Sequence, residues 1–220
     1  MEKRNALIAG ATGLVGNAIL QQLMVDNQYE KIIITTRKLI DVKHPKLIQQ
    51  QIDFDTIESL KLDSQVEDVF CALGTTIKTA GSQEAFYKVD YTYVVKLGKW
   101  CAANGVKRFM IVSAMGANAK SGIFYNRVKG DMETAVSQLN IPQIQVFRPS
   151  LLMGNRKEKR SGEKIAQVVM GTLGFLFMGP LLKYKGIHAN VVAKAMIKSA
   201  KAEVKGFKVY ESGEMQEMGS

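Results

Sequence analysis

Short apolar runs alternate with amphipathic stretches along most of this chain. The first run, at residues 6–9, precedes apolar positions at helical spacing over residues 14–23. Two longer stretches, at residues 83–104 and 124–139, repeat the helical spacing later in the chain. Further runs rich in branched or aromatic side chains, typical of buried strands, lie at residues 31–36, 47–52, 68–73, 108–112 and 143–147. This alternation predicts an α/β fold with a doubly wound parallel sheet that is covered on both faces.

The alternation ends after the sixth apolar run. Beyond it come a basic loop, an apolar stretch with helical spacing at residues 162–178, a helical pattern at 188–200 and a short strand pattern at 206–210. These elements are too few for a second domain. We therefore expect one domain over residues 1–220, in which residues 151–210 form a small C-terminal cap on the substrate side. The polar end of the chain is expected to be frayed.

Three glycines lie between the first predicted strand and the first predicted helix. Gly10 allows a sharp turn, Gly13 a close approach to a pyrophosphate, and Gly16 close packing of the helix on the strand. The anion would lie at the helix N-terminus, where unpaired N–H groups and the positive end of the helix dipole meet. The motif predicts a Rossmann-like dinucleotide site, with a glycine-rich turn that binds nothing as the alternative. The residues expected to bind are Gly10, Ala11, Thr12, Gly13, Leu14, Val15 and Gly16.

A basic residue follows the second predicted strand. In a unit that binds NAD, an acidic residue roughly 20 positions past the glycine loop binds the ribose hydroxyls, whereas a basic residue favours the 2′-phosphate of NADP. Here Thr36 and Arg37 occupy that region, and no acid is present there. We therefore expect NADP(H) to be preferred over NAD(H), with Arg37 as the phosphate ligand and Lys38 as a bystander.

Polar or small residues also follow the next two predicted strands, at the edge where such folds bind ligands. Asp53 either binds the adenine amino group or caps the short helix predicted at residues 56–62. Gly74 permits another close approach of the main chain to a ligand. Its neighbours Leu73 and Thr75 are expected to line the ribose and nicotinamide side of the cofactor.

Three further polar residues stand near the fifth predicted strand. Ser113 follows the end of that strand, and Tyr125 and Lys129 are four residues apart in the next predicted helix, so they share a face. Taken singly, Ser113 could be a capping or turn serine, and the other two a half-buried tyrosine beside a surface lysine. In combination, after this strand and this loop, they favour a catalytic group.

With the motif GATGLVG, these residues resemble those of the short-chain dehydrogenase/reductase superfamily, as an atypical member. The segments CALGTTIKTAGSQEAFYKVDYTYV, GVKRFMIVSAMGA, YNRVKGDME and VFRPSLLMG are similar to the Tat-interacting-protein-like branch of those NAD(P)H-binding proteins. The resemblance covers about residues 6–154 and is loose beyond them.

The resemblance implies a role for each matching residue. Tyr125 is expected to be the general acid/base, and Ser113 to orient the substrate carbonyl and donate a hydrogen bond to the developing oxyanion. Lys129 is expected to bind the nicotinamide ribose and to favour the tyrosinate, since a phenol has an unperturbed pKa of about 10 and a nearby ammonium favours its ionised form. Asp90 stands where many relatives have an asparagine that completes a proton relay, so this relay is expected to differ.

Composition narrows the class of protein. The formal net charge is +10, but the basic residues are scattered, so we expect solvated faces and a phosphate-rich cofactor rather than specific nucleic-acid binding. Cys71 and Cys101 are expected to be reduced core residues of a cytoplasmic protein without a metal site. We expect no signal peptide and no transmembrane segment, because the apolar residues 172–182 are too few to span a bilayer. Those residues could form a pocket wall, a homodimer surface or a membrane contact.

The sequence therefore predicts an NADP(H)-dependent oxidoreductase that transfers hydride to or from a small carbonyl or alcohol substrate. The alternative is an NADP(H)-binding regulatory or interaction protein with little or no turnover, since one fold hosts many functions. The intact Ser113, Tyr125 and Lys129 favour the enzyme, and Asp90 favours the alternative. An epimerase or dehydratase is a weaker interpretation, because the larger sugar-nucleotide domain of such enzymes has no room in this chain.

Overall fold

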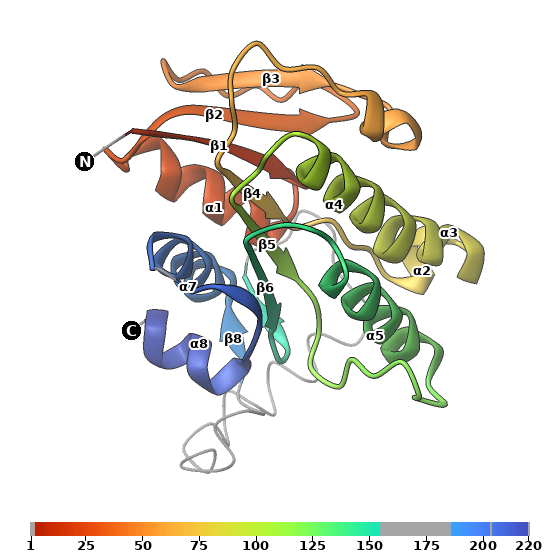
Figure 1. The fold of residues 1–220 in the computed structure, drawn as a ribbon. Helices are drawn as coiled ribbons and strands as arrows, with labels where there is room; N and C mark the ends of the chain where they lie inside the picture. Colours follow the sequence, from red (N-terminus) through yellow and green to blue (C-terminus); the bar gives the residue numbers. More distant parts are fainter. Residues whose placement is uncertain (1–2, 155–185, 203, 220) are drawn as a thin grey trace.

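A parallel sheet forms the centre of the protein, for which the computed structural model describes residues 3–154, 186–202 and 204–219. Within this part of the chain, seven strands lie in the order β3-β2-β1-β4-β5-β6-β9, and all the pairs are parallel (Figure 1). A short parallel pair, β7 (Leu152–Met153) and β8 (Ile187–His188), lies apart from the main sheet. The strands of the main sheet are β1 (Arg4–Ala9), β2 (Tyr29–Thr36), β3 (Leu47–Gln51), β4 (Asp68–Cys71), β5 (Arg108–Val112), β6 (Gln143–Arg148) and β9 (Gly206–Glu211).

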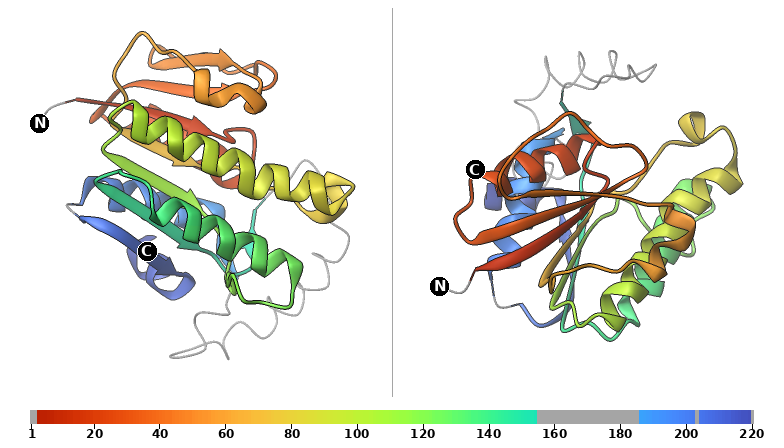
Figure 2. Two further views of the ribbon diagram at one scale, coloured as in Figure 1. Left: turned by 45° about the vertical axis from the view of Figure 1, so that its right-hand side comes forward. Right: turned by 90° about the horizontal axis from the view of Figure 1, so that it is seen from above.

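Helices cover both faces of this sheet. Figure 2 shows α1, α7 and α8 on one face, and α4 and α5 on the other. The doubly wound parallel fold predicted from the sequence is thereby confirmed. The helices are α1 (Leu14–Met24), the 3-10 helix η1 (Phe54–Ser59), α2 (Ile77–Ala80), α3 (Gln83–Tyr87), the π-helix η2 (Lys88–Thr92), α4 (Tyr93–Ala103), α5 (Phe124–Ser137), α7 (Ala189–Lys201) and α8 (Ser212–Gly219).

The strands bury side chains on both faces, which explains their nearly continuous apolar sequences. Successive side chains of a strand point to opposite faces. In β2, Ile32 and Ile34 join the core under α1 and α7, whereas Ile33 joins the core under α4 and α5. In β1, Ile8 and Leu7 divide in the same way. The sheet therefore holds two apolar cores apart, as expected for buried parallel strands.

The chain reverses its direction of travel across the sheet between β1 and β4. The order runs outward from β1 to β3 and then returns to the other side of β1. In open α/β sheets, ligands bind at such a reversal, outside the carboxyl ends of the strands. The loops that begin at Gly10, Ala72 and Ser113 all leave the carboxyl ends of their strands, so they meet at this edge.

The described elements of the predicted cap at residues 151–210 pack on or in the main sheet, and a cap on the substrate side remains a prediction. β9 pairs with β6 in the main sheet, and α7 packs against α1. The physical reason is the apolar stripe of α7, where Val192, Ala193 and Met196 are fully buried in the core shared with α1. The predicted helix at residues 162–178 and the apolar residues 172–182 lie outside the described residues.

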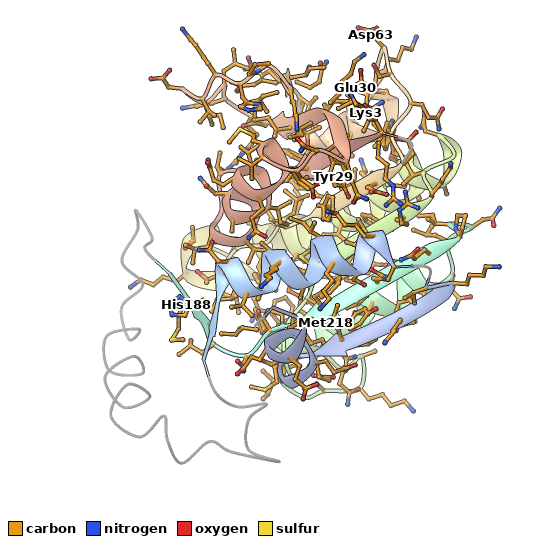
Figure 3. All side chains as sticks on the ribbon, turned by 90° about the vertical axis from the view of Figure 1, so that its left-hand side faces the viewer. Lys3, Tyr29, Glu30, Asp63, His188 and Met218 are labelled. Carbon is orange, nitrogen blue, oxygen red and sulfur yellow. The ribbon has the colours of Figure 1, made fainter. Side chains whose placement is uncertain are left out.

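One local prediction needs correction. The chain end expected to fray forms α8, because Met215 is fully buried and Met218 packs against the same core beside α7 (Figure 3). The helical pattern predicted at residues 83–104 is confirmed as one unbroken run of helical residues through α3, η2 and α4, and the structure adds the π-helical turn η2 within it. The π-helical turn changes which side chains of this segment face inward, and it buries Asp90.

A buried carboxylate joins the amino ends of four strands, β1, β2, β4 and β5. Asp68, the first residue of β4, accepts hydrogen bonds from Arg108 Nε and from the Tyr29 hydroxyl, the latter at 2.7 Å, and Arg4 lies 3.7 Å away. Burial raises the pKa of the Asp68 carboxyl, against the opposing effect of Arg108. Tyr29 lies in the core under α1 and α7 (Figure 3). Each of these donors therefore compensates a charge that has left water.

We expect Tyr29→Phe to destabilise the fold by about 1.5–3 kcal/mol, the usual loss for a hydrogen bond to a charged group. The ring would still fill the core, and the Asp68 carboxylate would lose one donor. Urea unfolding followed by circular dichroism measures the effect. Tyr87→Phe, at a side chain that is 38% exposed, is the matched control and should change stability by less than about 0.5 kcal/mol. Equal effects in the two variants would contradict the assigned role of Tyr29.

Candidate active site

Two of the three loop glycines are required by the fold itself. Gly10 has a φ of +89°, and a Cβ atom there would lie 2.6 Å from the Ala72 carbonyl oxygen. A Cβ atom on Gly16 would lie 2.1 Å from the Gly10 carbonyl oxygen. The loop after β1 is therefore pressed against both the end of β4 and the first turn of α1. These contacts bring the N-terminus of α1 to the edge of the sheet.

Gly13 is different, because no part of the described protein requires a glycine there. Its φ of −80° and ψ of 170° suit any residue, and the nearest atom to a Cβ would be the Gly10 carbonyl oxygen at 3.4 Å. Gly13 is exposed and is the N-cap of α1, where it supplies no capping side chain. The first turn of α1 thus presents its main-chain N–H groups beside an open space, which suits an anion such as a pyrophosphate.

The other predicted residues of this loop differ in exposure. Ala11 and Val15 are buried in the core, Leu14 is half-buried, and Thr12 is exposed. Contacts of Ala11, Leu14 and Val15 with a ligand would therefore involve mainly their main-chain atoms, whereas the Thr12 hydroxyl is open to a ligand.

Arg37 lies at the carboxyl end of β2, with its side chain exposed. The hydroxyl of the preceding Thr36 donates to the Lys38 carbonyl oxygen at 2.7 Å and accepts from the Lys38 N–H at 3.3 Å. The carbonyl oxygen of Arg37 accepts from Gln51 Nε2 on β3. These bonds fix the main chain on both sides of Arg37. Among the described residues, none is seen to bind its guanidinium.

Asp53 caps η1, as one of its two predicted roles required. Its carboxylate accepts a hydrogen bond from the Asp55 N–H at 2.9 Å. The side chain is exposed at the carboxyl end of β3. Its contact with an adenine group remains a prediction.

The loop after β4 is tied to the candidate catalytic helix through one carboxylate. Thr75 N–H donates to Asp90 Oδ2 at 2.8 Å, and Lys129 Nζ lies 2.7 Å from Asp90 Oδ1. Burial is the largest single effect on Lys129 and lowers its pKa, but the charge and hydrogen bond of Asp90, together with Tyr125 and Cys71, raise the pKa above its usual value. Gly74 is exposed directly above this pair, while Leu73 packs into the core.

Ser113 is held by a network that the sequence analysis did not include. Its N–H donates to the Phe147 carbonyl oxygen, and its hydroxyl donates to Glu133 Oε1 at 2.5 Å. Glu133 also accepts from Arg148 Nη2 at 2.5 Å. The hydrogen bond with Glu133 raises the pKa of the Arg148 guanidinium. A hydroxyl has one hydrogen, so the Ser113 hydrogen is engaged by Glu133.

Tyr125 lies half-buried in the first turn of α5, with its ring centroid 5.4 Å from that of Phe86 on α3. Close packing sets the position of this helix, because a Cβ atom on Gly130 would lie 2.1 Å from the Ala119 main-chain nitrogen in the loop after β5. Tyr125, Lys129 and Glu133 follow one another at intervals of four residues. They lie along one face of α5, toward the carboxyl edge of the sheet.

The structure thus brings together most of the predicted groups at one edge. The glycine loop meets the end of β4, and Asp90 joins that end to Lys129. Sequence reasoning missed Glu133 and Arg148. The available signal was the spacing of Glu133, one helical turn beyond Lys129.

The described residues also form cavities outside these groups. One cavity of about 190 Å³ lies beside Trp100, and another of about 350 Å³ lies between α1 and α7. Neither contains the candidate catalytic or glycine-loop residues. In the described part of the chain no cluster of three metal-ligating side chains occurs, and no helix has the length and apolarity needed to cross a bilayer. Cys71 and Cys101 are buried free thiols.

Residues 10–139 match a protein family described as NAD(P)H-binding. Protein HTATIP2 of Rattus norvegicus is 33% identical over 177 residues, which span 79% of this chain and 73% of that protein. Protein FMP52, mitochondrial, of Candida albicans is 34% identical over 209 residues, which span 92% of this chain and 90% of that protein. Because the second relative is named as mitochondrial, the predicted cytoplasmic location remains a prediction.

Solved structures match the fold. Bordetella bronchiseptica WbmH, in complex with NAD⁺, has a TM-score of 0.71 at 14% identity and matches 96% of this chain and 77% of that chain. The human epimerase family protein SDR39U1, with NADPH, has a TM-score of 0.60 at 18% identity and matches 94% of this chain and 74% of that chain. At these identities the likeness concerns the fold, and the two structures differ in the nucleotide that they contain.

We expect Gly16→Ala to destabilise the fold by about 1–3 kcal/mol or more, because its methyl group would collide with the main chain of Gly10. Gly13→Ala should cost less than about 1 kcal/mol, since its methyl group meets only an ordinary contact. Thermal and urea unfolding of both variants without nucleotide measures the difference. A Gly13→Ala variant as unstable as Gly16→Ala would show that the fold, and not a ligand, requires Gly13.

Proposed function

We propose, from the premise that this chain belongs to the NAD(P)H-binding family as an atypical short-chain dehydrogenase/reductase, that it is an NADP(H)-dependent oxidoreductase. It would transfer hydride to or from a small carbonyl or alcohol substrate. The observation that carries the proposal is the buried Lys129 ammonium on the same face of α5 as Tyr125, at the carboxyl edge where the glycine loop lies. Burying an ammonium costs free energy, so the position of Lys129 at this edge supports a role toward a ligand.

The residues present fit a dinucleotide. Gly13 leaves space that a Cβ atom would fill, next to the N–H groups at the start of α1. Gly10, Thr12 and Gly16 complete the loop that would hold the pyrophosphate. Arg37 would bind the 2′-phosphate, because its guanidinium is exposed beyond β2 and can make paired hydrogen bonds to a phosphate.

Asp53, Leu73, Gly74, Thr75 and Lys129 would bind the rest of the cofactor. One carboxylate oxygen of Asp53 caps η1, and the other could accept a hydrogen bond from the adenine amino group. Gly74 would let the cofactor approach the main chain above Lys129, whose ammonium has three hydrogens to donate.

When bound, NADPH supplies a hydride for a carbonyl carbon. Tyr125 would donate the proton to the carbonyl oxygen, and Lys129 would stabilise the negative charge that the phenol then carries. Ser113 would turn its hydroxyl hydrogen from Glu133 to the substrate oxygen. This exchange is feasible because Arg148 continues to donate to both oxygens of Glu133, so the carboxylate keeps a partner.

A regulatory or interaction protein that binds NADP(H) without turnover is the second candidate. The engagement of the Ser113 hydroxyl by Glu133 favours it, since the hydrogen needed for the oxyanion is already used within the protein. Both candidate functions use the same cofactor site. They differ in whether the Ser113 hydroxyl leaves Glu133 to donate to a substrate oxygen.

Turnover separates the candidates. Purified protein is incubated with NADPH and a panel of small aldehydes, ketones and quinones, and the absorbance of the nicotinamide is followed. Tyr125→Phe should lower the rate by about 10²–10⁴-fold while NADPH still binds, because it removes the proton donor. Tyr87→Phe, which changes a tyrosine on α3, is the control and should keep the rate. Equal negligible rates in wild type and Tyr125→Phe, with NADPH bound, would exclude the enzyme in favour of the regulator.

Nucleotide preference tests Arg37. Arg37→Ala should weaken NADPH binding by about 10–100-fold, the value of a charge-assisted hydrogen bond, and leave NADH binding nearly unchanged. Lys38→Ala is the matched control, because it removes the same charge one position further along the chain. Titration of both nucleotides by calorimetry gives the affinities. If Arg37→Ala keeps the wild-type preference, the 2′-phosphate has another ligand.

A further inference from the structure

Asp90 occupies an unusual place at the edge of the sheet. It lies in the one-turn π-helix η2, a form that often occurs at functional sites, and its side chain is 1% exposed. Each of its oxygens faces a different element. Oδ2 accepts from Thr75 N–H in the loop after β4, and Oδ1 lies 2.7 Å from Lys129 Nζ on α5.

The ion pair does not use all the hydrogens of the ammonium. Lys129 Nζ lies 2.7 Å from Asp90 Oδ1, a contact that engages one of its three hydrogens. The others can be donated to a ligand. Gly74 covers the pair with main chain alone, since a Cβ atom there would lie 3.3 Å from Asp90 Oδ1 and 3.8 Å from Lys129 Nζ. Only main chain therefore separates this buried pair from the exposed side of the loop.

The charge of Asp90 also keeps Lys129 protonated. The titratable groups that act on Lys129 are Asp90 on η2, Tyr125 on α5 and Cys71 on β4, and burial opposes all three by lowering the pKa of Lys129. Of these, Asp90 has the largest effect. Without the charge of Asp90, burial would act on Lys129 with less opposition, so Lys129 would lose its proton at a lower pH than in the wild type, and with it part of its donor capacity.

From this geometry we propose that Asp90 is a positioning residue, which sets both the Gly74–Thr75 main chain and the Lys129 ammonium for the nicotinamide ribose of the bound cofactor. The inference rests on the proposed function. It adds that one buried carboxylate determines how the nicotinamide half of the cofactor is bound. The adenosine half, held near Arg37 and Asp53, is independent of Asp90.

Binding of two nucleotides to Asp90→Asn tests this division. Asparagine keeps an oxygen for Thr75 N–H and removes the charge that faces Lys129. NADPH should bind about tenfold or more weakly to the variant, and increasingly so as the pH rises, whereas adenosine 2′,5′-bisphosphate, which lacks the nicotinamide ribose, should bind within about twofold of wild type. Calorimetry measures both affinities. Asp26→Asn, which removes a carboxylate paired with Lys201 far from this edge, is the control and should bind both as wild type does.

Asp90→Glu is a second variant, in case asparagine lowers stability too far. It keeps the charge on a longer side chain, so NADPH binding should be weakened without the added dependence on pH. An Asp90→Asn protein that binds NADPH like wild type, or that loses both nucleotides equally, would overturn the inference alone. The same pH-dependent loss in Asp90→Glu as in Asp90→Asn would also overturn it. A wild-type protein that binds neither nucleotide would overturn the proposed function and this inference with it.

Discussion

A buried positive charge constrains the whole carboxyl edge of the sheet. Lys129 is 3% exposed, and taking an ammonium out of water costs several kcal/mol unless a counter-charge lies close. Asp90 provides that charge, and Thr75 N–H holds its second oxygen. The π-helical turn, the end of β4 and the first half of α5 must therefore keep their relative places, because a shift of any one would leave a charge alone.

The two edges of the sheet hold different kinds of buried carboxylate. At the amino edge, Asp68 accepts from Tyr29 and Arg108 and lies 3.7 Å from Arg4, so it has little to offer a ligand. At the carboxyl edge, Asp90 holds Thr75 N–H and the Lys129 ammonium, and that ammonium keeps hydrogens for a ligand. The first carboxylate stabilises the fold, whereas the second also leaves a donor at the edge. This contrast agrees with a fold in which ligands bind beyond the carboxyl ends of the strands.

The sequence was informative where the signal is local. Runs such as that of Ile32, Ile33 and Ile34 predict buried strands by themselves, and the glycines predicted the loop that packs main chain on main chain. The pairing of β9 with β6 was not predicted, because it joins residues far apart in the chain. The terminal helix was missed because only Met215 and Met218 make its polar sequence amphipathic. The partners of Lys129 and Ser113 likewise come from other elements, which periodicity cannot reveal.

The two proposed functions, enzyme and regulator, differ in which group accepts the hydroxyl hydrogen of Ser113. Ser113 donates to Glu133 in this structure, and a short bond to a carboxylate is stronger than one between neutral groups. A neutral carbonyl oxygen would compete poorly for that hydrogen. An oxygen on which negative charge develops would compete well, and Arg148 would continue to compensate Glu133. The network therefore disfavours donation to a ground-state carbonyl and permits it when charge develops, which is the difference that catalysis requires.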